Sequence, residues 1–301
     1  DMLNILNAPE HLGYLAYLHS TAALSASNPS ANKYYKLGAD INLERNFWLP
    51  IGSTEANGWM FEGTFDGNGY SITNLDLYAF ENVLNAGNGV AQNNMPIGFF
   101  GATNGANIYN LKVDGTLRYL ANGSITRTLD VNEGVQENKK ARIINSPNVY
   151  IGGLIGFANN TTIVASEFNS PINYSEYNYT DDSSYQSVNV GGLVGYLNNG
   201  SIRDSGFNNS IVVTKFNVDN NNSQVGGLVG SAQGEVTIKA SRAKGTPLIT
   251  SGELVNNVGG LVGLANIINI VDSYAIFNSD ATGGNTIGGL LGKATSANIK
   301  T

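Results

Sequence analysis

A six-residue pattern is the feature that most constrains how this chain can fold. It reads apolar residue, Gly, Gly, Leu, apolar residue, Gly, and it occurs at Ile151–Gly156, Val190–Gly195, Val225–Gly230, Val258–Gly263 and Ile287–Gly292, with a degenerate copy at Pro96–Gly101. Measured at the second glycine, successive copies lie 55, 39, 35, 33 and 29 residues apart. A constant motif with spacers of changing length is typical of a repeated structural coil with variable surface loops.

A second set of matching positions follows each glycine cluster. It begins with an isoleucine, at Ile163, Ile202, Ile238 and Ile270, with counterparts at Ile72, Ile108 and Ile299. Three residues later stand Leu75, Leu111, Ser166, Ser205, Ser241 and Ser273. The isoleucines are therefore predicted to point inward and to stack coil on coil. The small glycine and serine positions are predicted where the backbone bends or strands approach closely.

Strands explain this pattern better than helices. A glycine inside a helix costs about 1 kcal/mol relative to alanine, whereas short runs of Val, Ile, Phe and Tyr between Asn-Gly turns are typical of strands. One such coil cannot bury a core alone, so parallel stacking is needed. The predicted fold class is all-β, a right-handed parallel β-helix with long loop excursions. Whether Leu154 or Ile155 points inward is left open, because both are apolar.

The two ends of the chain differ. Leucines at near-helical spacing in Pro9–Ser27 predict an N-terminal helix that caps the first coil. The chain ends two residues after Ile299 begins another coil, so we expect a fragment of a longer protein. We interpret 1–301 as a single β-helix domain. Its parts are a cap (1–34), first coils (35–118), a long loop (119–150) and the glycine-motif coils (151–301).

The composition excludes several kinds of chemistry. The chain has no cysteine and two histidines, which excludes thiol chemistry and zinc–cysteine sites. A net charge of −7 argues against a nucleic-acid-binding protein. Both histidines fall in the predicted cap helix, where a partly buried or surface imidazole is the favoured interpretation. The turn at Phe65–Gly69 is similar to a calcium loop but lacks its alternating carboxylates, so a structural turn is favoured. No cofactor and no metal site are predicted.

Three segments together resemble a known family. They are Tyr35–Leu43 (YKLGADINL), Trp48–Gly52 (WLPIG) and Phe61–Leu75 (FEGTFDGNGYSITNL), followed by the repeated GGLVG motif. This combination resembles the GLUG-repeat regions of bacterial surface proteins, including adhesins similar to filamentous haemagglutinin and IgA1-cleaving metalloproteases. The resemblance implies a secreted or cell-surface β-helix. The H-E-x-x-H zinc signature of those proteases is missing from the sequence, so any part taken from such an enzyme would be non-catalytic.

An enzyme acting on polysaccharides is an alternative interpretation, because parallel β-helices also include such enzymes. Their chemistry needs clustered carboxylates, and the acids here are scattered, at Asp114, Glu167, Asp204, Glu235 and Asp272. Asp204 and Asp272 occupy the same position in coils separated by one other coil. At a strand spacing of about 4.8 Å they would lie about 9–10 Å apart, a separation compatible with an inverting carboxylate pair. Our prediction is nevertheless that the chain is not an enzyme.

Long loops are the predicted binding regions, because recognition residues are often carried on loops held by a rigid scaffold. Two excursions are long, Phe80–Asn94 and Tyr119–Tyr150, and a third, Tyr174–Ser187, is rich in tyrosine. The candidate binding residues are Arg127, Lys139, Lys140, Arg142, Tyr174, Tyr177, Tyr179 and Tyr185. The candidate structural glycines of the repeat are Gly153, Gly192, Gly227, Gly260 and Gly289. Solvated loops without a ligand are the alternative interpretation.

The sequence thus predicts a non-catalytic segment of a bacterial surface or secreted adhesin. Its expected partners are a host glycan or host surface protein and the flanking domains of the same chain, with no nucleic acid and no insertion into a membrane. The alternatives are a purely structural stalk and, less favoured, a polysaccharide-active β-helix enzyme.

Overall fold

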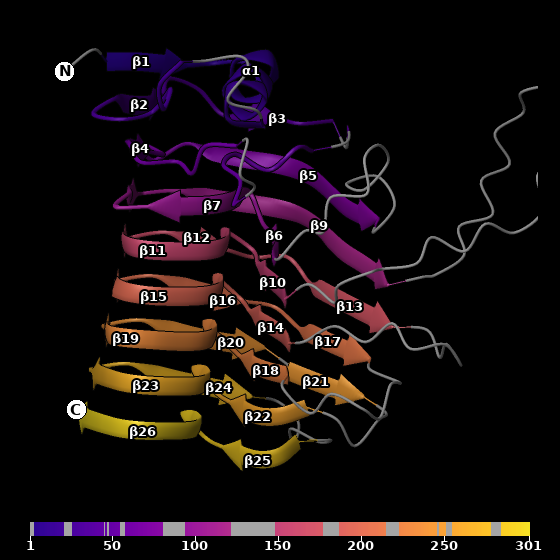
Figure 1. Ribbon diagram of the computed structural model, residues 1–301, viewed down its shortest axis with the longest axis vertical. Helices are drawn as coiled ribbons and strands as arrows, with labels where there is room; N and C mark the ends of the chain where they lie inside the picture. Colours follow the sequence, from indigo (N-terminus) through magenta and orange to yellow (C-terminus); the bar gives the residue numbers. More distant parts are fainter. Residues whose placement is uncertain are drawn as a thin grey trace, which may run out of the picture.

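The computed structural model describes residues 3–20, 26–44, 46, 48–54, 58–80, 94–121, 148–176, 187–214, 223–245, 247–250, 255–277 and 284–301. Strands of successive coils stack along one long axis, from the N-terminal end of the molecule to the C-terminal end (Figure 1). All strand pairs are parallel and form three sheets, which we call A, B and C. The architecture is a parallel β-helix, as the repeat predicted.

Sheet A has ten strands in the order β1-β2-β4-β8-β11-β15-β19-β23-β26, and β7 also pairs with β11. Their bounds are β1 (Leu3–Leu6), β2 (Tyr34–Leu37), β4 (Thr64–Asp66), β7 (Phe100–Asn104), β8 (Asn107–Tyr109), β11 (Ile155–Val164), β15 (Val194–Arg203), β19 (Val229–Lys239), β23 (Val262–Val271) and β26 (Leu291–Lys300).

Sheet B also has ten strands, in the order β21-β17-β13-β9-β12-β16-β20-β24, with β5 pairing β9 and β3. Their bounds are β3 (Ile41–Asn42), β5 (Ser71–Phe80), β9 (Lys112–Ala121), β12 (Glu167–Phe168), β13 (Ile172–Glu176), β16 (Gly206–Asn208), β17 (Ile211–Thr214), β20 (Arg242–Gly245), β21 (Pro247–Thr250) and β24 (Tyr274–Phe277).

Sheet C has six strands in the order β25-β22-β18-β14-β10-β6. Their bounds are β6 (Asn94–Ile97), β10 (Asn148–Gly152), β14 (Ser187–Gly191), β18 (Ser223–Gly226), β22 (Val255–Gly259) and β25 (Gly284–Gly288). A complete coil therefore passes from sheet C through the glycine motif into sheet A and then into sheet B.

The predicted isoleucine column is the centre of the core. Ile108, Ile163, Ile202, Ile238 and Ile270 are in register across β8, β11, β15, β19 and β23, and each is 0% exposed. Ile299 continues the column in β26 but is 49% exposed. Stacked aliphatic side chains of this kind are the hydrophobic contribution that a single coil lacks.

The first coil departs from the predicted alignment. Ile72 lies in sheet B opposite Val113, whereas Phe65 occupies the position opposite Ile108. The prediction that Ile72 belongs to the isoleucine column is therefore wrong. The physical reason is the turn after Phe65, where Asn68 and Gly69 adopt positive φ values of 53° and 82° and take up residues that the later coils do not have.

The glycine motif forms the corner between sheets C and A, which we call the glycine corner. A Cβ atom on Gly191 would overlap the carbonyl oxygen of Val194 in the same coil, and one on Gly195 would overlap the backbone of Ile151 in the preceding coil. The two strands thus approach each other on their outer sides, where only glycine fits. On the inner side, Leu154 and Ile155 are both 0% exposed. Both side chains are therefore buried, which answers the question that the sequence left open.

The N-terminal helix predicted as a cap is present as α1 (Pro9–Ser20). It buries Leu12, Leu15, Ala16 and His19. The His19 ring lies 5.8 Å from the ring of Phe61, and the backbone N–H of Trp59 donates to the His19 carbonyl. The helix therefore packs on the first coils. Within the described residues, no helix has the length and apolar content needed to cross a bilayer.

The second glycine of the motif gives a direct test of this packing. In Gly192→Ala the new Cβ would overlap the Gly227 carbonyl oxygen and the Phe207 ring, so we expect a loss of about 1–3 kcal/mol in stability. The measurement is urea unfolding followed by circular dichroism. Gly289→Ala is the matched control, because at the same motif position in the last coil a Cβ meets no atom within 4 Å. Equal effects of the two substitutions would contradict the packing.

Candidate functional site

The predicted loop residues lie almost entirely outside the described part of the chain. Arg127, Lys139, Lys140 and Arg142 fall within 122–147, and Tyr177, Tyr179 and Tyr185 fall within 177–186. Their role in binding stays a prediction. The structure does define the strands on either side of the first segment, because β9 ends at Ala121 and β10 begins at Asn148.

Tyr174 is the one candidate binding residue that the structure describes, and its assignment is wrong. It lies in β13, in register with Val213 of β17, and its side chain is 0% exposed within the hydrophobic core. Sheet B continues as β13 where the sequence suggested that a loop had begun, so alternation along that strand turns the ring inward. Tyr174 belongs to the core and is not available to a ligand on the surface.

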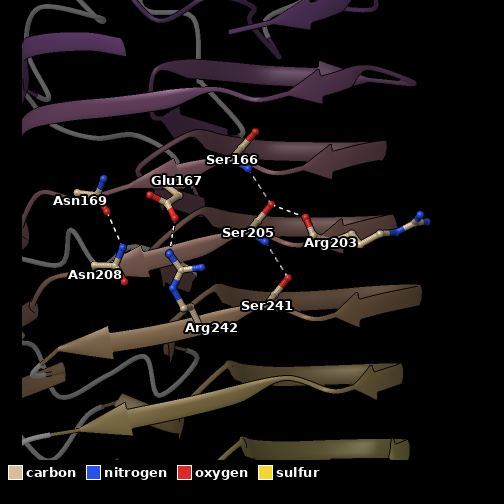
Figure 2. Close-up of polar contacts among 8 residues, drawn as sticks. All are labelled: Ser166, Glu167, Asn169, Arg203, Ser205, Asn208, Ser241 and Arg242. Atoms are coloured by element: carbon tan, nitrogen blue, oxygen red, sulfur yellow. Dashed lines mark hydrogen bonds and ion pairs between the residues drawn. The ribbon is translucent and has the colours of Figure 1, made fainter. Parts of the chain in front are cut away.

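A ladder of serines connects sheets A and B (Figure 2). The Ser166 N–H donates to the Ser205 hydroxyl at 3.1 Å, and the Ser205 N–H donates to the Ser241 hydroxyl at 3.2 Å. Each hydroxyl donates in turn to the carbonyl two residues earlier, as Ser205 does to Arg203 at 2.7 Å. The serine column that the sequence placed at a backbone bend is thus a hydrogen-bonded turn that locks successive coils in register.

The residue before each serine adopts a left-handed backbone. Positive φ values between 47° and 50° occur at Ala165, Asp204, Ala240 and Asp272. Asp and Asn tolerate this conformation better than most residues, which explains why Asp204 and Asp272 stand here. The two acids do share one column, with Ala240 between them, as predicted. The backbone geometry therefore accounts for the presence of these two acids.

The outer face of sheet B beside this turn carries a cross-coil ion pair (Figure 2). Glu167 of β12, Gly206 of β16 and Arg242 of β20 are in register. The Arg242 guanidinium crosses Gly206, where its Cζ would lie 3.2 Å from a Cβ, and pairs with Glu167. Glycine at the middle position gives the arginine its path. Beside the pair, the Asn208 amide donates to Asn169 at 2.7 Å.

Four further side chains flank the same turn, two at its sheet A side and two at its sheet B side, and were not singled out from the sequence. Arg203 and Lys239 are exposed and in register on β15 and β19. Lys244 is exposed on β20, and its Nζ lies 5.6 Å from the ring centroid of Tyr274 on β24, which is 42% exposed. The signal available in the sequence was the run Lys239–Lys244 (KASRAK), which has three basic residues and no acid. We call Arg203, Lys239, Lys244 and Tyr274 the basic turn.

An aromatic cluster fills the outer side of the glycine corner. The rings of Phe157 and Tyr196 stack at 5.3 Å between centroids, and Tyr150 of sheet C lies 4.9 Å from Tyr196. Burial raises the pKa of the Tyr150 phenol to about 12. Farther along the corner, Asn257 donates to Gln224, and both are less than a tenth exposed. This surface is packed closed by its own side chains.

The buried histidine of the cap belongs to a polar network. The Nδ1 of His19 lies 2.8 Å from the Leu15 carbonyl and the Nε2 lies 2.9 Å from the Ser30 hydroxyl. The side chain is 0% exposed. Burial lowers its pKa from the ordinary value, the hydrogen bond to Leu15 opposes that effect, and the charge of Lys33 adds to it. His19 is a structural residue of the cap and is more deeply buried than the partly buried or surface imidazole that the sequence favoured.

The Asp66 turn is structural as well. Its carboxylate accepts from the Asn68 N–H at 2.8 Å, the Asn110 amide at 3.0 Å and the Tyr34 hydroxyl at 2.8 Å. Burial acts to raise the carboxyl pKa, but these hydrogen bonds and the charge of Lys36 outweigh it, so the pKa lies below its ordinary value. Among the described residues, no three His, Cys, Asp or Glu side chains come together as metal ligands would.

Residues 186–212 match the family model described as the GLUG motif. They run from the start of β14 through β15 and β16 into β17, which is one complete coil of the solenoid. The chain carries the GLUG motif. The resemblance drawn from the sequence is confirmed, and the GLUG unit corresponds in this structure to one passage through sheets C, A and B. No curated protein sequence matches this chain.

Two solved structures are similar in fold. One is the crystal structure of a "putative immunoglobulin A1 protease from Bacteroides ovatus", with a TM-score of 0.50, 15% identity and coverage of 98% of this chain and 84% of that chain. The other, named IgA1 protease, has a TM-score of 0.48 and 17% identity, and it covers 91% of this chain and 19% of that chain. This chain therefore spans about a fifth of the second protein's length. The first likeness supports the β-helix fold.

The strain at the left-handed position of the turn can be tested by placing a better-suited residue at position 240. Ala240 has a Cβ at a φ of 47°, whereas asparagine tolerates that conformation. Ala240→Asn should raise the free energy of unfolding by about 0.5–1 kcal/mol, measured by urea unfolding. Ala240→Val should lower it, because a β-branched residue is disfavoured there. A destabilised asparagine variant would show that this position is not limited by backbone strain.

Acid should weaken the cap through His19. Its pKa is lower in the folded state than in the unfolded state, so the unfolded chain binds more protons as the pH falls below 6.5. The contribution of neutral His19 to the free energy of unfolding is therefore complete above that pH and is lost progressively below it. Melting temperatures from about pH 7 to about pH 5 should fall for the wild type and fall less for His19→Gln. The exposed His11→Gln is the control and should behave as the wild type. An unchanged slope in His19→Gln would contradict this role.

Proposed function

We propose that this chain, which carries the GLUG motif, is a non-catalytic segment of a bacterial surface or secreted adhesin that binds a glycan or a host protein. The supporting observation is the contrast between the two sides of sheet B. Its inner side chains form the core, whereas its outer face presents Lys112, Lys244, Tyr274 and Ile276 to solvent on rigid strands. Exposed aromatic and cationic side chains on a fixed scaffold are suited to recognition.

The surface location is supported by the GLUG motif, which the sequence resemblance associates with bacterial surface proteins. The similar fold of a structure named as an IgA1 protease raises proteolysis as another possibility. The zinc signature H-E-x-x-H is missing from this sequence, and both histidines belong to the cap helix, where His19 is buried. We therefore propose a binding role for this segment.

A purely structural stalk is the second candidate. It is favoured by the ladders that run along the axis, such as Asn104, Asn159 and Asn198, whose amides are linked in succession at 2.8 Å. Such ladders stabilise the stack without presenting free groups. A stalk requires no ligand, and this difference separates the two candidates.

A binding screen against a glycan array and host matrix proteins tests the proposal. The purified chain should show at least one saturable interaction. A loop variant is made in which the sequence of residues 122–147 is replaced by that of residues 215–222, the shorter segment that joins β17 to β18. This replacement leaves β9 and β10 intact. Loss of binding at an unchanged melting temperature would assign the ligand to the long loop, and retained binding would assign it to a side face. A folded chain that binds nothing would favour the stalk.

A further inference from the structure

We propose that the basic turn is the site at which this chain binds an acidic polysaccharide, with Arg203, Lys239 and Lys244 holding its carboxylate or sulfate groups and Tyr274 stacking on a sugar ring. This inference rests on the proposed binding function and adds the site and the chemical class of the ligand.

The charges at this site are not required by the fold. Arg203 and Lys239 lie directly opposite each other on neighbouring strands, about 4.8 Å apart along the axis. Like charges in that arrangement destabilise a sheet. The neighbouring coils have Val164 and Val271 at the same position, so an uncharged side chain is accommodated there. A cost to stability that the coil could avoid indicates a role outside folding.

The protein neutralises only one cation in this region. Arg242 is paired with Glu167 and is held across Gly206. Among the described residues, Arg203, Lys239 and Lys244 form no ion pair. The Arg203 side chain extends away from the coil (Figure 2). The same turn also carries two exposed acids, Asp204 and Asp272. The three cations outnumber these two acids, so in a chain with a net charge of −7 the turn keeps a net positive charge that attracts an anion.

The neighbouring aromatic residue points to a sugar rather than to a simple anion. Tyr274 follows Arg242 in register and is 42% exposed, and its ring has the Lys244 ammonium 5.6 Å from its centroid. A tyrosine ring offers an apolar face and a hydroxyl on a rigid strand, which suits the apolar face of a pyranose. A cation beside that ring would meet the charged substituent of the same sugar.

The geometry also favours a linear polymer. Arg203, Lys239 and Lys300 occupy one column along the solenoid axis, with Val271 between the last two. Successive positions in such a column are separated by the strand spacing of about 4.8 Å. A chain of acidic sugars lying along the axis would therefore meet these cations in succession, whereas a compact anion would contact one or two of them.

The test compares two variants with equal loss of charge. In the first, Arg203, Lys239 and Lys244 are each changed to Gln. In the control, Lys33, Lys36 and Lys293, which lie on other parts of the solenoid, are each changed to Gln. Binding is measured by titration with chondroitin sulfate, hyaluronan and carboxyl-reduced hyaluronan. Both variants should keep the wild-type circular dichroism spectrum, because the substituted side chains are outside the core.

We expect the wild type to bind the two acidic polymers but not the reduced one, more weakly as salt rises. The basic-turn variant should lose about tenfold or more in affinity, and the control should remain close to wild type. Tyr274→Ala should weaken binding while Tyr274→Phe retains it, which a purely electrostatic attraction would not produce. Similar binding of the two polymers would identify the carboxylate, which both carry, as the recognised group, and a marked preference for chondroitin sulfate would identify the sulfate.

Three results would overturn the inference. Equal losses in both variants would show an unspecific charge effect. Binding of a neutral glycan or host protein that is unaffected by the basic-turn variant would place the ligand elsewhere and leave the proposed function standing. A folded wild type that binds no glycan and no host protein would end both proposals.

Discussion

The close approach of sheets C and A at the glycine corner is the constraint on which the rest of the structure depends. Two glycines per coil, such as Gly191 and Gly195, face outward where the opposing backbone leaves no room for a Cβ. The chain can therefore fold back at this corner and bring Leu154 and Ile155 together on the inner side. The register of all three sheets follows, because each corner fixes where the next strand of sheet A begins.

The serine turn completes this constraint at the other end of sheet A. Ser205 links its own coil to both neighbours through its N–H, its hydroxyl and the Ser166 N–H. Side chains on the outer surface take no part in these contacts. Residues such as Arg203 and Tyr274 can therefore change without disturbing the coil, which separates the part of the sequence that folds from the part that can recognise a partner.

The repeat made most of the fold predictable from the sequence, because each coil places the same constraint on its backbone and so needs the same type of residue at matching positions. The glycine clusters, the isoleucine column from Ile108 onward and the cap helix are found where expected. Ile72 was misplaced because the turn after Phe65 occurs once and leaves no repeated signal. Tyr174 was misplaced because a strand continued into a polar, tyrosine-rich segment. The basic turn was missed because its residues belong to three coils and meet only when these stack.

The ladder of serines also has a mechanical consequence. Because each coil contacts only its immediate neighbours, a load applied to the two ends of the solenoid is transmitted through every turn in series. The contact between neighbouring coils that is easiest to break therefore sets the load that the whole stack can bear. Under tension the molecule would lengthen in steps of one coil, while the remaining coils keep their shape.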